Sequence, residues 1–193
     1  MTDHGLALID LDGVLVNWVG GALKLIGRSE DDPDLRDILL SGEHPPFDAL
    51  FGGRDQLDAV IKQAGKEFWM NLDIFEWAER LVEIVLDSGL KCAFLTSHGS
   101  WPEAAGFKLE FLADTWGHIP VFVGKHKGIL GNPTSLLIDD FAQNIHSFKL
   151  NGGQVFHWPN HLLLKEDATL VNETLEDLRL VLWRMGLLEQ RRF

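Results

Sequence analysis

Short apolar runs alternate with longer amphipathic segments along most of this chain. The runs are rich in Leu, Ile, Val and Phe, and their length and continuity are typical of strands buried in a parallel sheet. Five such runs are found, at residues 6–9, 91–95, 121–123, 136–138 and 154–157. The sequence therefore predicts a sheet of parallel strands.

Helical periodicity fills the intervals between these strands. Apolar residues recur at helical spacing over 74–85, and Gly89 follows as a helix stop. A second helix is predicted over 100–112, where Ser100 and Glu103 have the spacing of a capping box. Further helices are expected over 141–150 and 170–185. Strand and helix thus alternate, which predicts an α/β fold with a Rossmann-like, doubly wound parallel sheet.

One region, residues 17–71, departs from this rhythm. It contains no convincing strand, and two proline-containing breaks divide it into short amphipathic pieces. The pieces cover residues 19–26, 35–40 and 57–64. We interpret 17–71 as a small helical cap inserted after the first strand, and 1–16 together with 72–193 as the catalytic core. Such a lid could cover a site and exclude water from it.

Charge and composition narrow the classes of partner. The 193 residues carry a formal net charge of -12, which argues against a protein that holds duplex nucleic acid through its backbone phosphates. A small anionic substrate remains compatible if a divalent cation reverses the local charge. Cys92 is the single cysteine, and no targeting signal or membrane span is evident, so a cytoplasmic protein is expected. A homodimer is compatible with this composition.

Two acidic pairs carry the strongest chemical signal. Asp10 and Asp12 follow the first strand, and Asp139 and Asp140 follow the run at 136–138. Either pair alone is also explained as a solvated turn, because Asp and Gly are ordinary turn residues. Neighbouring parallel strands bring their carboxyl ends together, however, so four carboxylates would converge. A hard cation such as Mg²⁺ allows them to stay ionised together.

Weaker signals complete a phosphate site. Thr96 and Ser97 end the second strand, where a hydroxyl and free backbone amides could bind phosphate oxygens, although such a pair is also common in turns and helix caps. Phosphoryl transfer also requires a cation that faces the transferred group. Lys125 and Lys127 both follow the third strand, and Lys127 is the preferred candidate.

Taken in order, these motifs resemble the four motifs of the haloacid dehalogenase (HAD) superfamily. Within it, the chain resembles the 5′(3′)-deoxyribonucleotidase branch, because a helical insertion follows the first motif, an aromatic pair lies at Phe68-Trp69, and a lysine-containing helix runs from Lys108 to Gly117. One departure is His98-Gly99, where these nucleotidases tend to have proline after Thr-Ser.

The resemblance implies a role for each site residue. Asp10 would attack phosphorus, and Asp12 would protonate the leaving oxygen and then deprotonate the hydrolytic water. Asp10, the backbone carbonyl of Asp12, and Asp139 would bind Mg²⁺, with Asp140 as a further ligand or an outer-shell group. The phosphate would be held by Thr96, Ser97 and Lys127. An acid at position 12 also argues against the dehalogenase branch.

The lid aromatics Phe68 and Trp69 are candidates for stacking on a nucleobase, although packing within the lid explains them as well. The leading hypothesis is a Mg²⁺-dependent phosphomonoester hydrolase that acts on nucleoside 5′-monophosphates. Alternatives are a phosphatase of sugar phosphates or of polynucleotide 3′ ends, and a catalytically silent protein that binds a nucleotide or a partner.

Overall fold

A computed structural model describes residues 5–41 and 44–190 of the chain. Its centre is a parallel sheet of five strands in the order β3-β2-β1-β4-β5. The strands are β1 (Leu6–Ile9), β2 (Lys91–Thr96), β3 (Val121–Val123), β4 (Ser135–Asp139) and β5 (Gln154–His157). The predicted fold class and all five predicted strands are confirmed. Residues 1–4, on which part of the expectation about a targeting signal rests, lie outside the described residues.

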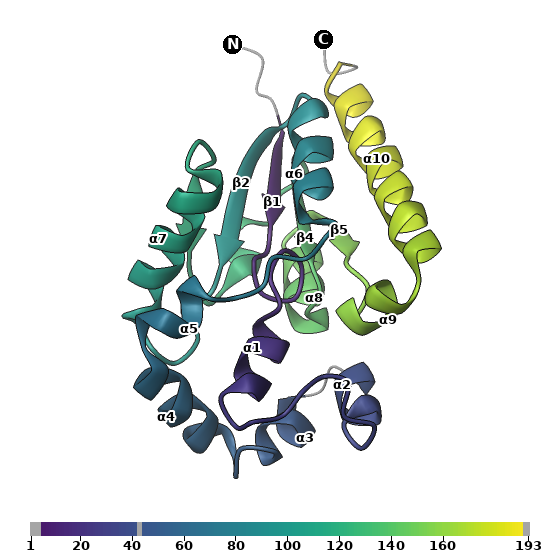
Figure 1. Cartoon of the computed structure of the whole chain (residues 1–193). Helices are drawn as coiled ribbons and strands as arrows, with labels where there is room; N and C mark the ends of the chain where they lie inside the picture. The colour runs from purple at the N-terminus through teal and green to yellow at the C-terminus, as the bar shows by residue number, and fades with distance from the viewer. Residues whose placement is uncertain (1–4, 42–43, 191–193) are drawn as a thin grey trace.

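The order of the strands places β1 in the middle of the sheet. Leu6 pairs with Lys91 of β2 on one side and with Ser135 of β4 on the other. The ladder continues one residue past β1, where the amide of Asp10 donates to the carbonyl of Ile138 at 2.9 Å. All strands point the same way (Figure 1), so the residues that follow β1, β2 and β4 meet at one edge.

Helices cover both faces of the sheet, and alternate strand residues serve the two faces. On one face, residues such as Ile9 and Phe94 pack in the larger apolar core with three helices: α6 (Ala78–Asp87), α7 (Ala104–Trp116) and α10 (Ala168–Gln190). On the other face, Leu8 and Leu137 pack with Phe148 of α8 (Ala142–Leu150). Side chains of successive strand residues point to opposite faces, and both faces are covered, which explains the continuous apolar runs within β1, β2 and β4.

Two predicted helices begin later than their sequence signals suggested. The helix expected from residue 74 begins at Ala78, because Ile74 instead forms an antiparallel bridge with Val16. The capping box expected at Ser100 and Glu103 does not form, and α7 begins at Ala104. The hydroxyl of Ser100 donates to Asp58, far away in the sequence, so a tertiary contact takes the group that would have capped the helix.

The segment between β1 and α6 is helical, and it lies beyond the carboxyl ends of the strands (Figure 1). Its helices are α1 (Trp18–Lys24), α2 (Arg36–Ser41), α3 (His44–Ala49), α4 (Arg54–Ala64) and α5 (Lys66–Met70). Helices α3 and α5 were not predicted. Pro45 and Pro46, which we interpreted from the sequence as a break, lie in the first turn of α3. A missing amide hydrogen costs little there, because the first amides of a helix have no partner within it. We refer to residues 17–71 as the lid.

The carboxyl-terminal region adds α9 (His161–Glu166), which sequence periodicity did not indicate, and the long α10. A short 3₁₀ helix, η1 (Lys127–Leu130), connects β3 to β4. Among the described helices, none combines the length and the apolar character needed to cross a bilayer.

Candidate active site

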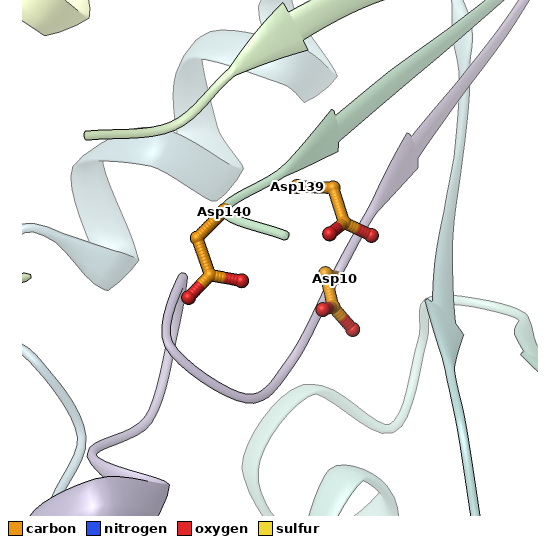
Figure 2. Close-up of side chains that lie close together, drawn as sticks. All are labelled: Asp10, Asp139 and Asp140. Carbon is orange, nitrogen blue, oxygen red and sulfur yellow. The ribbon is translucent and has the colours of Figure 1, made fainter. Parts of the chain in front are cut away.

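Three carboxylates converge at the carboxyl ends of β1 and β4. Asp10 follows β1, Asp139 is the last residue of β4, and Asp140 follows it. One oxygen from each of the three lies within 4.8 Å of the others. Figure 2 shows Asp10 and Asp139 side by side at adjacent strand ends, with Asp140 directed toward the loop that follows β1. The predicted convergence of these acids is therefore present in the structure.

Lys127 stands between two of these acids. Its Nζ lies 2.5 Å from Oδ1 of Asp10 and 2.7 Å from Oδ2 of Asp139, and its side chain is almost fully buried. Burial alone would lower the pKa of Lys127, but the carboxylates of Asp10 and Asp139 raise it above its ordinary value. The ammonium group is thus held charged beside the predicted nucleophile. Lys125, the alternative candidate, lines the cavity described below.

Asp12 has its own cation, Lys108 of α7. The buried ammonium of Lys108 donates to Oδ2 of Asp12, to Oγ1 of Thr96 at 3.0 Å and to the backbone carbonyl of Ser97 at 2.7 Å. The other oxygen of Asp12, Oδ1, is buried and has no hydrogen-bond partner among the described residues. Burial raises the pKa of Asp12 above its ordinary value, against the opposing charge of Lys108. Asp12 therefore offers an unengaged oxygen and a tendency to hold a proton.

The turn after β1 requires a glycine. Gly13 has a φ of +80°, and a Cβ at this position would lie 2.0 Å from Oδ2 of Asp140. The amide of Gly13 donates to the carbonyl of Val16 at 3.0 Å, which closes the turn. Glycine is thus needed both for the left-handed backbone and for the close approach of Asp140.

The charges at this edge do not balance by themselves. Four carboxylates, those of Asp10, Asp12, Asp139 and Asp140, face the two lysines 108 and 127. Burial, reinforced by the charge of Asp10, raises the pKa of Asp139 to about 6 and that of Asp140 well above its usual range. A divalent cation would supply the missing positive charge, and an all-oxygen set suits Mg²⁺. The residues present therefore fit the expected metal.

The two hydroxyl residues predicted to bind phosphate differ in their surroundings. Thr96, the last residue of β2, is fully buried, and its hydroxyl accepts a hydrogen bond from Lys108. Ser97 lines the cavity, and its Oγ accepts from the amide of Gly99 at 3.1 Å. Gly99 has a φ of +59°, so this turn uses a left-handed backbone that favours glycine.

A cavity of about 1030 Å³ lies between the acidic cluster and the lid. It is lined by Asp10 and Asp12 at one side and by lid residues at the other. Trp69 borders this cavity, and the ammonium of Lys108 lies 4.7 Å from its ring centroid. Phe68 is not among the lining residues. It packs edge-on against Trp18 and Trp69 inside the apolar core.

Two site residues were not in the sequence-based set. The sequence analysis named Lys108 only as part of a helix that resembles one in the nucleotidases. Its position offered a signal, because it lies on the apolar side of α7, in line with Ala104 and Phe111. A lysine is rarely buried without a partner, so a lysine on that side indicates a buried ion pair. Asn144, whose Nδ2 lies 3.1 Å from both oxygens of Asp139, carried no such signal. An asparagine near a helix start is too common to single out.

Comparison with known proteins identifies the fold. No family model matches the chain, and no curated protein does so significantly. Among solved structures, a HAD family hydrolase from Deinococcus radiodurans R1, with bound phosphate and sodium, has a TM-score of 0.56 at 16% identity, covering 97% of this chain and 98% of that one. A hydrolase from Streptococcus pneumoniae TIGR4 has a TM-score of 0.54 at 17% identity, covering 85% and 97% respectively.

A predicted phosphatase from Clostridium acetobutylicum is similar as well, with a TM-score of 0.52 at 13% identity, covering 84% of this chain and 90% of that one. At these identities, the likeness establishes a shared fold. The chain thus has the α/β fold of the HAD-type hydrolases.

Proposed function

We propose that this protein is a Mg²⁺-dependent phosphomonoesterase that acts through an aspartyl-phosphate, and that its substrates are nucleoside 5′-monophosphates. One observation carries the proposal: the acids that follow β1 and β4 converge with two buried lysines at the floor of one lid-covered cavity. Buried charges at this density are costly for a fold, and they are typical of sites where charge is handled during a reaction.

The residues divide the chemistry between them. A carboxylate oxygen of Asp10 forms a bond to phosphorus while the bond from phosphorus to the leaving oxygen breaks. Asp12, whose pKa is raised by burial, donates its proton to that leaving oxygen. In the second step, Asp12 takes a proton from water, whose oxygen attacks the same phosphorus and releases Asp10. Lys127, held charged between Asp10 and Asp139, neutralises the phosphoryl oxygens.

The metal would be held by Asp10, Asp139, Asp140 and the backbone carbonyl of Asp12. When bound, Mg²⁺ withdraws charge from the phosphoryl oxygens and stabilises the transition state. Asn144 and the amide of Phe141 hydrogen-bond to Asp139, which fixes the orientation of that carboxylate. Lys108 holds Asp12 toward the cavity in the same way.

The choice of a nucleotide rests on the lid. The cavity extends well beyond the acidic cluster, and the lid contributes aromatic faces at Trp18, Phe47 and Trp69. Flat, largely apolar groups suit such a lining, and nucleobases stack well on aromatic side chains. Trp69 is therefore the stronger candidate of the predicted pair for base contact, whereas Phe68 supports the lid from within.

A substrate panel with added Mg²⁺ tests the proposal. It comprises deoxynucleoside monophosphates, sugar phosphates, a 3′-phosphorylated oligonucleotide and phenyl phosphate. We expect kcat/KM to be highest for the nucleoside monophosphates, and EDTA to abolish turnover until Mg²⁺ is restored. A preference for sugar phosphates or the oligonucleotide would contradict the nucleotide substrate. Absence of turnover on every compound would favour a silent binding protein.

A further inference from the structure

Arg54, in the first turn of α4, is a cation that lines the cavity from the lid. Its Nε lies 3.2 Å from Oδ1 of Asp58, and its Nη1 lies 3.7 Å from Oδ1 of Asp48. Both acids are largely buried, whereas the Arg54 side chain is 44% exposed. The contact with Asp48 is too long for a hydrogen bond, and Oδ1 of Asp48 has no hydrogen-bond partner among the described residues. The guanidinium thus keeps N–H donors that its ion pair with Asp48 does not use.

Asp58 is itself fixed from the core. The hydroxyl of Ser100, in the loop between β2 and α7, donates to its Oδ2. Asp58, Arg54 and Ser100 all line the same cavity as Asp10 and Asp12. This contact explains why Ser100 does not cap α7. The guanidinium is therefore held at the cavity wall by a chain of contacts that starts in the core and crosses to the lid.

The charges of this group determine what it can recognise. Arg54 contributes one positive charge, and Asp48 and Asp58 contribute two negative charges at contact range. A second anionic group of a substrate would meet one cation that is already neutralised and two carboxylates, so its binding would be unfavourable. An uncharged oxygen acceptor would meet a pre-oriented N–H donor, and a hydrogen bond from a charged donor is a strong one.

We propose that Arg54 determines the specificity for the leaving group: its guanidinium donates to an uncharged oxygen acceptor, and Asp48 and Asp58 exclude leaving groups that carry a second negative charge. This inference rests on the proposed function, because it assumes that the acidic cluster cleaves a phosphomonoester whose leaving group fills the cavity. Asp58 and Ser100 are positioning residues that act through Arg54.

The test compares two nucleotides with the same leaving oxygen. They are 2′-deoxyuridine 5′-monophosphate and its 5-carboxy derivative, which adds one negative charge to the base, and phenyl phosphate is assayed beside them. For the wild-type protein, we expect kcat/KM to be at least about tenfold lower for the carboxylated nucleotide. For Arg54→Met, we expect the ratio of kcat/KM for deoxyuridine monophosphate to that for phenyl phosphate to fall about twentyfold, mainly through KM.

A second variant acts in the opposite direction. Asp58→Asn keeps an acceptor for Ser100 but removes one negative charge, so discrimination against the carboxylated nucleotide should shrink about fivefold. Arg80→Met, which changes an exposed arginine on α6 that contacts Asn172, is the matched control and should leave both ratios unchanged.

The outcomes separate this inference from the function it rests on. If phenyl phosphate is hydrolysed but the nucleotides are no better, the nucleotide substrate is wrong. If the nucleotides are preferred but Arg54→Met leaves the ratio intact, or if the carboxylated nucleotide is the better substrate, the role of Arg54 is wrong. Preference for the carboxylated nucleotide would mean that Arg54 binds a second anionic group of the substrate.

Discussion

The acidic cluster and the lid are built in opposite ways. The cluster stands at the ends of β1 and β4, and the sheet register fixes its position, since Ile9 pairs with Ile138 and the next residue of each strand is a site aspartate. The lid contributes no strand to the sheet. Its apolar side chains join the main core, and individual polar contacts add to this packing, such as Glu30 with His161, Asn160 with the carbonyl of Leu39, and Ser100 with Asp58. Sheet geometry therefore places the reacting groups, whereas side-chain packing and separate polar contacts place the lid.

This difference predicts how each region responds to mutation. Changes in the cluster should remove activity with little effect on how the lid packs, because the sheet holds the backbone in place. Changes in the lid contacts should alter stability and substrate preference while the reacting groups stay where they are.

The largest effect is expected for Asp10→Asn. An amide is a poor nucleophile, so turnover of phenyl phosphate should fall by about ten-thousandfold or more. Thermal stability should stay equal or rise, because the change removes a negative charge beside Asp139 and Asp140. Phosphate release and a melting curve measure the two quantities. Asp31→Asn, at an exposed acid of the lid, is the control and should keep full activity. Normal turnover in Asp10→Asn would show that the nucleophile is another group.

The two lysines that follow β3 provide the next comparison. Lys127→Met removes the ammonium between Asp10 and Asp139, so kcat should fall by about a hundredfold to a thousandfold. Lys125→Met changes a lysine that lines the cavity, and we expect less than about a threefold loss. Steady-state assays of both variants at saturating Mg²⁺ decide between them. A larger loss in Lys125→Met would reverse the assignment of the phosphate-binding lysine.

The smallest effect concerns the lid contact at Glu30. Burial would raise the pKa of this carboxyl, but the hydrogen bonds from His161 and Lys165 dominate and lower it to about 2 from the ordinary value of 4.5. Because the folded-state pKa is the lower one, the contact contributes its full stability above pH 4.5 and loses it as the pH falls toward 2. Glu30→Gln should cost about 2 kcal/mol of unfolding free energy at neutral pH.

Urea unfolding of Glu30→Gln and the wild type between pH 7 and pH 3 provides the measurement. The difference in unfolding free energy should narrow below pH 4.5. Glu166→Gln is the matched control, because Glu166 also joins α9 to the lid, through an exposed pair with Arg36 of α2. We expect little change from it. A difference for Glu30→Gln that does not vary with pH would show that shape, and not charge, holds this contact.

The sequence carried enough information for the sheet and the cluster. Continuous apolar runs such as Leu136 to Ile138 indicate buried parallel strands, and the acids that follow them gather at one edge by topology alone. From the sequence, Lys127 could be preferred over Lys125 as the phosphate-binding lysine, but the choice could not be settled. It depends on how η1 turns back toward the sheet.

The contacts across the lid could not be predicted in this way. The capping box at Ser100 was a reasonable local signal, but Asp58, 42 residues away in the sequence, is the partner that the hydroxyl takes. Glu30 and His161 are 131 residues apart, and no periodicity connects them. Helix α5 is five residues long, too short for apolar spacing to reveal. Short helices and long-range polar contacts depend on the whole fold.

The place where the lid leaves and rejoins the core has an evolutionary consequence. Val16 bridges Ile74, the amide of Asn17 donates to the carbonyl of Asp73, and the amide of Phe75 donates to the carbonyl of Leu15. Backbone hydrogen bonds therefore join the two ends of the lid. Because these bonds use only backbone atoms, they are compatible with many side chains at those positions. An insertion whose two ends are joined in this way is a separate unit that can be replaced without changing the core. Recombination or design can exchange it for one of another length and lining, while the chemistry beneath is inherited unchanged.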